Sequence, residues 1–162
     1  MRARSEVMNH SNQREHCDVM RHFVVGLIAL VFCGDSLARL SSELKCMADN
    51  LHHEARVDGV AGMAAVASVV MNRVASPRYP NTVCKVVHQR KQFSWTMYKR
   101  LKRQKLKHDW KTLMVATLAL KGQLIDKTGG ATHYHALYVQ PYWAAHLPFT
   151  VQIGTHLFYK DE

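Results

Sequence analysis

The segment HHEAR places one glutamate, Glu54, directly before an apolar run, and a glutamate in that setting can do acid chemistry. Leu44, Ala48 and Leu51 recur at helical spacing, which puts Glu54 at the border of an apolar helix face. A carboxyl group partly removed from water has a raised pKa and keeps its proton near neutral pH. The general acid of glycoside cleavage needs that property. An ion pair with Arg56 is the plainer interpretation, and the residues alone leave both open.

Histidine-rich segments suggest a second chemistry, that of a zinc-dependent amidase. Two histidines at positions i and i+2 of a strand can share a metal ion. The candidates are His52, His53, His133, His135, His146 and His156. The sequence contains no HExxH motif, so we expect no metal and no other cofactor, and the amidase remains an alternative.

A basic segment, KRLKRQKLK over residues 99–107, has six cationic residues in nine. The chain carries a net charge of +10. Such a surface suits polyanions, so a nucleic-acid-binding module is an alternative of another class. No zinc-finger, helix-turn-helix or aromatic RNA-binding motif accompanies the run. We therefore expect Lys99 to Lys107 to contact an anionic cell-wall or membrane surface, and we expect no nucleic acid.

The N-terminal segment has the pattern of a secretory signal. Arg21 precedes an apolar run over residues 23–33, and small residues follow up to Ala38. The run is short for a membrane span, which needs about 20 apolar residues. We expect a leader over residues 1–38, with Met20 as one candidate start, and a catalytic domain over residues 39–162. Export to the periplasm or cell wall follows from this pattern, the alternative being a buried N-terminal helix.

Two of the four cysteines, Cys46 and Cys84, lie beyond the predicted leader. In an exported domain they are expected to pair, whereas in a reducing compartment both would be buried thiols. The remaining pattern predicts helices first and a small sheet late, which is an α+β fold. The predicted helices cover residues 41–56, 60–71 and 110–121, and the predicted strands cover residues 132–139 and 156–159.

Separated motifs then occur in a recognisable order. They are EAR at a helix end, an apolar helix closing on NRV, SPRYPNT, QFSW, a Gly-Gly before a strand, and a terminal IGTHLFY. Together they resemble the SleB/CwlJ-type cell wall hydrolases over residues 43–160. The resemblance implies a compact lysozyme-like helical domain with a small C-terminal antiparallel sheet, and a monomer. It also implies an enzyme that acts on the glycan strands of peptidoglycan. A single, strongly basic domain behind a signal segment suits an endolysin-like role, by analogy.

The catalytic glutamate of that family falls on Glu54. The resemblance implies a lytic transglycosylase that cleaves the bond between N-acetylmuramic acid (MurNAc) and N-acetylglucosamine (GlcNAc), with Glu54 as general acid and then base. Candidates for lining a substrate groove are Gln92, Ser94, Tyr134 and Trp143, and His135 is a further substrate-binding candidate.

The sequence departs from the family pattern directly after Glu54. EARGE is usual, whereas this chain has EARVDG, so Asp58 stands where a second glutamate is common. Asp58 is a supporting acid in one interpretation and a helix-ending residue in the other. In the strand, alternation places His133 and His135 on one face and Tyr134 on the other.

Overall fold

The computed structural model describes residues 38–161. Residues 41–162 group into one compact unit. Apart from Ala38, the predicted leader lies outside the described residues, and the domain boundary stays a prediction. Residues 38–54 are helical, and the later elements are η1 (Arg56–Asp58), α2 (Gly59–Ala75), α3 (Val83–Val87), η2 (Ser94–Met97), α4 (Lys99–Lys102), α5 (Trp110–Leu120), β1 (His133–Ala136), η3 (Tyr142–Ala145), β2 (Phe149–Ile153) and β3 (His156–Tyr159), where η marks a 3-10 helix.

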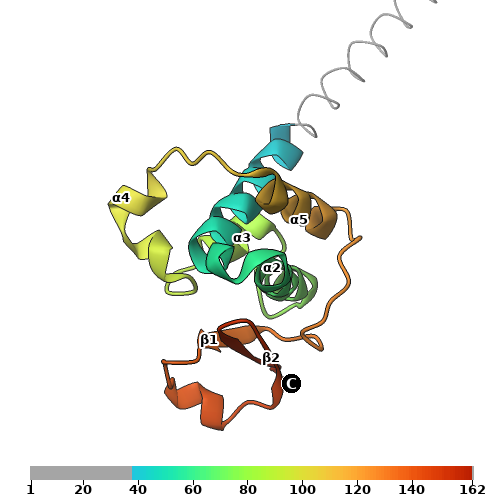
Figure 1. Cartoon of the computed structure of the whole chain (residues 1–162), viewed down its shortest axis with the longest axis vertical. Coiled ribbons are helices and arrows are strands. Elements are labelled where there is room, and N and C mark those ends of the chain that lie inside the picture. The colour runs from blue at the N-terminus through green and yellow to red at the C-terminus, as the bar shows by residue number, and fades with distance from the viewer. Residues whose placement is uncertain (1–37, 162) are drawn as a thin grey trace, which may run out of the picture. The chain divides into compact units, whose positions relative to one another are not determined.

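Helix α2 lies at the centre of the helical part, with α3 and α5 beside it (Figure 1). Its sequence is apolar nearly all round, and most of its residues are buried. The helix over residues 41–54 contributes Met47, Ala48 and Leu51 to the same core. Within the described residues, one stretch, 56–75, reaches the length and hydropathy of a membrane span by composition only, and half of it is buried inside the protein. We therefore treat α2 as a core helix.

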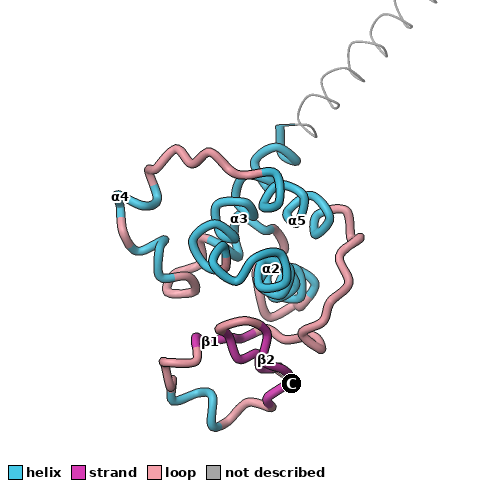
Figure 2. The backbone as a smooth tube through the Cα atoms, viewed as in Figure 1, coloured by secondary structure: helices cyan, strands magenta, loops and turns pink. Residues whose placement is uncertain are grey.

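The sheet has three antiparallel strands in the order β1-β3-β2 and lies beside α2 (Figure 2). A second apolar cluster joins the two layers, because Ala65 and Val69 of α2 pack against Phe158 of β3 and Ala131. In the register, Tyr134 faces Phe158, and His135 faces Leu157 along the strands. The predicted α+β fold with a small C-terminal antiparallel sheet is confirmed.

A disulfide joins Cys46 to Cys84, with 5.2 Å between the two Cα atoms. It ties the helix over residues 41–54 to α3. The bridge closes a loop with a sequence separation of 38 residues, for which the loss of chain entropy in the unfolded state predicts about 4 kcal/mol of stabilisation.

Three expectations about the elements were wrong. Helix α2 continues to Ala75 instead of ending at Met71, because Arg73 is buried and packs over Tyr79 and Phe93. The first helix ends at Glu54 rather than Arg56. Strand β2 was not predicted, and it is partly exposed along its length.

Candidate active site

Glu54 is the last residue of its helix, immediately before the turn at Ala55, and its side chain is half-buried. The helix buries Leu51 and Ala55 completely, so the carboxyl group sits on the rim of the core. Burial raises the pKa of Glu54, and a hydrogen bond from the Tyr134 hydroxyl opposes part of that rise. The two oxygens, Tyr134 Oη and Glu54 Oε2, are 3.0 Å apart.

Tyr134 reaches Glu54 from β1, 80 residues later in the chain. Its ring packs edge-on against His156 at 5.1 Å between centroids and tilts over Phe158 at 5.6 Å. Burial, followed by the Glu54 carboxylate, raises the pKa of Tyr134 well above its ordinary value. The phenol therefore stays protonated at neutral pH and donates to the Glu54 carboxylate.

The Glu54–Tyr134 pair has the chemical form of a general acid with a supporting donor. A carboxyl group with a raised pKa can hold a proton and then give it to a leaving oxygen. Once the proton has left, the Tyr134 hydroxyl stabilises the resulting carboxylate. The arrangement can therefore transfer a proton in both directions.

Asp58 lies one helical turn beyond Glu54 and holds the turn between β2 and β3. Its carboxylate accepts hydrogen bonds from the Thr155 backbone N–H at 3.1 Å and the Thr155 hydroxyl at 2.9 Å, and contacts His156 Nδ1 at 3.0 Å. The Asp58 side chain is 5% exposed. These contacts anchor the sheet to the start of α2, and Asp58 is also the last residue of η1.

Two glycines make room for Asp58. A Cβ atom added at Gly154 would lie 2.8 Å from the Asp58 carboxyl carbon, and one added at Gly62 would collide with Asp58 Cβ. Gly154 also has a φ of 57°, which a residue with a side chain rarely adopts. The close approach of the β2–β3 turn to α2 therefore depends on both glycines.

The C-terminal end of α2 positions β1, a role that the sequence interpretation missed. Asn72 Nδ2 donates to the Ala131 carbonyl at 2.9 Å, and Arg73 Nε donates to the Thr132 carbonyl at 2.7 Å. These carbonyls directly precede the strand that carries Tyr134. The motif NRV was recognised, but nothing in its spacing shows that its polar side chains bind a segment 59 residues away.

Two predicted groove residues, Gln92 and Ser94, belong to the segment around η2. Ser94 is exposed, and Gln92 is half-buried. The next residue, Trp95, stacks on His53 at 4.7 Å and donates to the Asn50 side chain at 2.9 Å. The segment is therefore packed against the helix that ends at Glu54. His53 is half-buried by this stack.

His135 and Trp143 lie on the other side of the sheet from Glu54. The Trp143 ring packs against His133 at 5.2 Å and against His135 at 5.6 Å between centroids, while Tyr134 on the same strand points toward Glu54. The structure thus places these two residues on the other side of the sheet from Glu54, and their role in substrate binding stays a prediction. Alternation along the strand is the physical reason for this placement.

Within residues 38–161, no three His, Cys, Asp or Glu side chains are arranged to hold a metal ion. His133 and His135 instead pack on Trp143, and His156 contacts Asp58. His52 and His108 lie edge to face at 5.9 Å, and His108 pairs with Asp49 at 2.8 Å. These histidines thus have aromatic or carboxylate partners within the protein, whereas His146 is exposed.

A sequence model of the cell wall hydrolase family matches residues 57–159. The match includes Asp58 and Tyr134 and begins after Glu54. A spore cortex-lytic enzyme of Halalkalibacterium halodurans is 30% identical over 118 residues, which is 72% of this chain and 34% of that protein. The chain thus spans about a third of the length of this curated relative.

Two solved structures are similar to the chain. The catalytic domain of the germination-specific lytic transglycosylase SleB from Bacillus anthracis is 28% identical, with a TM-score of 0.64, over 73% of this chain and 93% of that one. The catalytic domain of the Bacillus cereus SleB protein is 28% identical, with a TM-score of 0.65, over 74% and 91%. These similarities accord with the motifs found in the sequence, and none of them is to an amidase.

Proposed function

Because the chain belongs to the cell wall hydrolase family, we propose that it cleaves the MurNAc–GlcNAc bond of peptidoglycan as a lytic transglycosylase. Glu54 is the proposed general acid and base. The observation that carries this proposal is the carboxyl group of Glu54 at a helix end, with its pKa raised by burial and its oxygen 3.0 Å from the Tyr134 hydroxyl. The similarity to the SleB catalytic domains supports it.

The proposed reaction needs one carboxyl group used twice. Protonated Glu54 gives its proton to the glycosidic oxygen, and the bond from that oxygen to C1 of MurNAc breaks. The Glu54 carboxylate then takes the proton of the MurNAc 6-hydroxyl, whose oxygen attacks C1 and closes a 1,6-anhydro ring. The N-acetyl group of the substrate stabilises the positive charge at C1. Glu54 thereby regains its proton.

A second carboxylate is not required by this scheme, and the nearest acid in sequence does not offer one. Asp58 is occupied by Thr155 and His156. We therefore assign Asp58 an anchoring role, and we assign Tyr134 the role of stabilising the Glu54 carboxylate between the two proton transfers. Ser94 and Gln92 remain substrate-binding candidates on the segment beside the helix of Glu54.

The basic segment over residues 99–107 is the proposed contact with an anionic wall or membrane surface. All six of its cationic residues are exposed, while Leu101 and Leu106 are partly buried and fix it to the protein. Exposed cationic side chains attract a polyanion, and added salt weakens that attraction by screening the charges. We propose that this surface concentrates a monomeric enzyme on the wall, and we expect no nucleic-acid partner.

Export follows from the same proposal, because peptidoglycan lies outside the cytoplasm. The disulfide between Cys46 and Cys84 suits an oxidising compartment. We propose that the leader ending near Ala38 directs the chain to the periplasm or wall, where it acts in an endolysin-like way. Mapping of non-reduced peptides from exported protein is expected to recover Cys46 linked to Cys84.

Mass spectrometry of purified peptidoglycan digested by the 162-residue chain tests the chemistry. We expect anhydro-muropeptides, formed equally with and without EDTA, and none from the Glu54→Gln variant. Reducing MurNAc ends would make the enzyme a hydrolase with water as the acceptor. Free stem peptides that disappear with EDTA would favour the amidase alternative and overturn the role of Glu54.

A further inference from the structure

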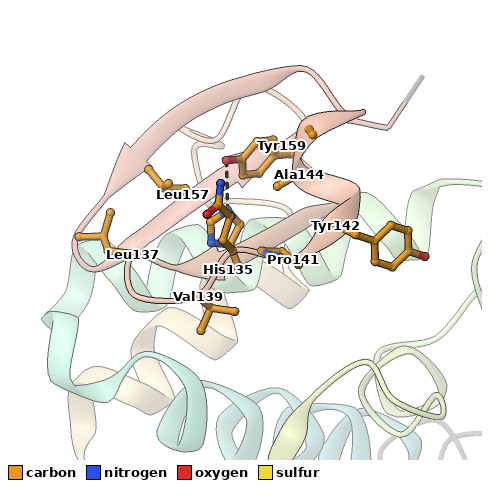
Figure 3. Close-up of a pocket in the computed structure, with 10 residues that line it drawn as sticks. His135, Leu137, Val139, Pro141, Tyr142, Ala144, Leu157 and Tyr159 are labelled. Carbon is orange, nitrogen blue, oxygen red and sulfur yellow. Dashed lines mark hydrogen bonds between the residues drawn. The ribbon is translucent and has the colours of Figure 1, made fainter.

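A cavity of about 600 Å³ lies on the side of the sheet away from Glu54 (Figure 3). It is open on one side and is lined by β1, β3, the loop that follows β1 and η3, with His135 and Tyr159 forming part of its wall. On β1, the side chain of Tyr134 points to Glu54, whereas His135, its neighbour, lines this cavity. The cavity is therefore separate from the proposed catalytic site, and its volume falls in the range of about 300–1,000 Å³ that suits small ligands.

The walls of the cavity are held in place without a ligand. The Leu137 N–H donates to the Thr155 carbonyl at 2.9 Å, and the Val139 N–H donates to the Ala136 carbonyl at 2.9 Å. Trp143 of the following turn, η3, packs on the rings beneath the loop, including Tyr159 at 5.5 Å. A cavity whose walls are already ordered loses little entropy when a ligand binds.

His135 and Tyr159 form a hydrogen-bonded pair in the cavity, and the donor and acceptor in it can be identified. His135 Nδ1 is 2.9 Å from the Ala136 carbonyl, which only accepts, so Nδ1 carries the hydrogen. Nε2 then accepts from the Tyr159 hydroxyl at 3.1 Å, the contact drawn in Figure 3. The Tyr159 oxygen keeps free lone pairs, so it can accept a hydrogen bond from a hydroxyl or amide N–H of a ligand.

The rest of the lining is uncharged, although the chain has a net charge of +10. Leu137, Val139 and Leu157 form apolar walls, and Gln140 adds an amide. Tyr142, at the rim, is 86% exposed and points away from the other lining side chains (Figure 3). Because this ring points away from the cavity, it can stack only on the C–H face of a neighbouring sugar of the same glycan strand that extends past the rim.

We propose that this cavity is a second glycan-binding site that takes a neutral N-acetylhexosamine, the GlcNAc residue of the wall strand. The proposal rests on the proposed function, which supplies the glycan. A stem peptide carries carboxylate and amino groups, and this cavity has no charged side chain to pair with them. GlcNAc has no charge, offers hydroxyl and amide donors to Tyr159, and has an acetyl methyl for the apolar wall. The site would hold the enzyme on its insoluble polymer apart from the bond being cleaved.

The test is a titration of the full chain, labelled with nitrogen-15 and carrying Glu54→Gln, with triacetylchitotriose, followed by amide chemical shifts. We expect saturable shifts over residues 135–144. Tyr142→Ala should weaken this binding about tenfold, the loss that one aromatic contact of about 1.5 kcal/mol represents. Tyr138→Ala is the matched control, because Tyr138 is 89% exposed on the same loop and does not line the cavity.

The outcomes separate this proposal from the proposed function. Shifts confined to the surroundings of Glu54 and Tyr134, or no shifts at all, would overturn the second site. Equal losses from Tyr142→Ala and Tyr138→Ala would do the same. Saturable shifts at the cavity in a chain whose unmodified form releases no muropeptides would support the glycan site and overturn the lytic activity.

Discussion

The two sides of strand β1 differ by a single step along the chain. On one side, Tyr134 donates to a carboxyl group whose pKa is raised by burial. On the other side, His135 contacts Tyr159 and Trp143 and lines an uncharged cavity. The first side holds an ionisable carboxyl group, that of Glu54, at the boundary of the core. The second side holds the uncharged hydrogen-bonded pair of His135 and Tyr159.

The difference shows how a three-stranded sheet serves two tasks. The side facing the helices is constrained by the apolar cluster with Phe158, so a polar group there must be paired, as Tyr134 is with Glu54. The other side is covered by the loop after β1 and the short 3-10 helix η3. That cover leaves space for a ligand. We therefore expect proton transfer on the first side and only binding on the second.

Of the substitutions on the two sides of the sheet, Glu54→Gln should reduce activity most, because it removes the only proposed proton donor. We expect wall lysis to fall by about 10²–10⁴-fold, the contribution typical of general acid–base catalysis. The measurement is release of soluble muropeptides, with Glu43→Gln, on the same helix, as control. Burial raises the pKa of Glu54, so its ionised form destabilises the fold above that pKa, and Gln at neutral pH should preserve or increase stability. Full lytic activity in the variant would refute the assignment.

Asp58→Ala should disturb both sides together, since Asp58 holds the turn that carries β3. The variant loses two exposed hydrogen bonds from Thr155 and one part-buried contact with His156, and at about 1 kcal/mol each we expect about 3 kcal/mol of destabilisation in urea unfolding. Asp109→Ala is the graded control, because this exposed N-cap accepts one hydrogen bond from Thr112 and should cost about 1 kcal/mol. Equal effects from the two variants would contradict the anchoring role.

Tyr134→Phe should give the smallest effect and the sharpest distinction between the sides. The Tyr134 hydroxyl stabilises the Glu54 carboxylate, so removing it raises the pKa of Glu54 further. Because the proposed reaction begins with protonated Glu54, the alkaline limb of the pH–activity profile should move to higher pH. Tyr159→Phe, on the other side of the sheet, should leave that limb in place. A shift caused by both variants, or by neither, would break the distinction.

Much of the helical part was predictable from local pattern. Helix α5 covers nearly all of the predicted residues 110–121, and β3 covers the predicted residues 156–159. Strand β2 was missed because it is a partly exposed strand at the edge of the sheet, with little alternation to mark it. The end of α2 was misplaced because Asn72 and Arg73 suggest a helix end by type, yet both bind residues near β1.

The site was predictable in part. Helical spacing placed Glu54 on the rim of the apolar face, and the resemblance to the family gave it a role. The contact with Tyr134 spans 80 residues and depends on sheet packing, which no local pattern reveals. Alternation did predict that Tyr134 and His135 face opposite sides of the strand, as the structure has them.

The length of the Asp58 side chain sets the distance between the start of α2 and the β2–β3 turn. Gly62 and Gly154 close tightly around Asp58, so the Asp58 carboxylate acts as a fixed spacer between the start of α2 and the β2–β3 turn. A glutamate there would be one methylene longer and would push the turn outward. Because β3 is bonded to β1, that displacement would pass to Tyr134 and change its distance from Glu54. Asp58, Gly62 and Gly154 therefore depend on one another, and we expect a larger residue at any one of them to require changes at the others.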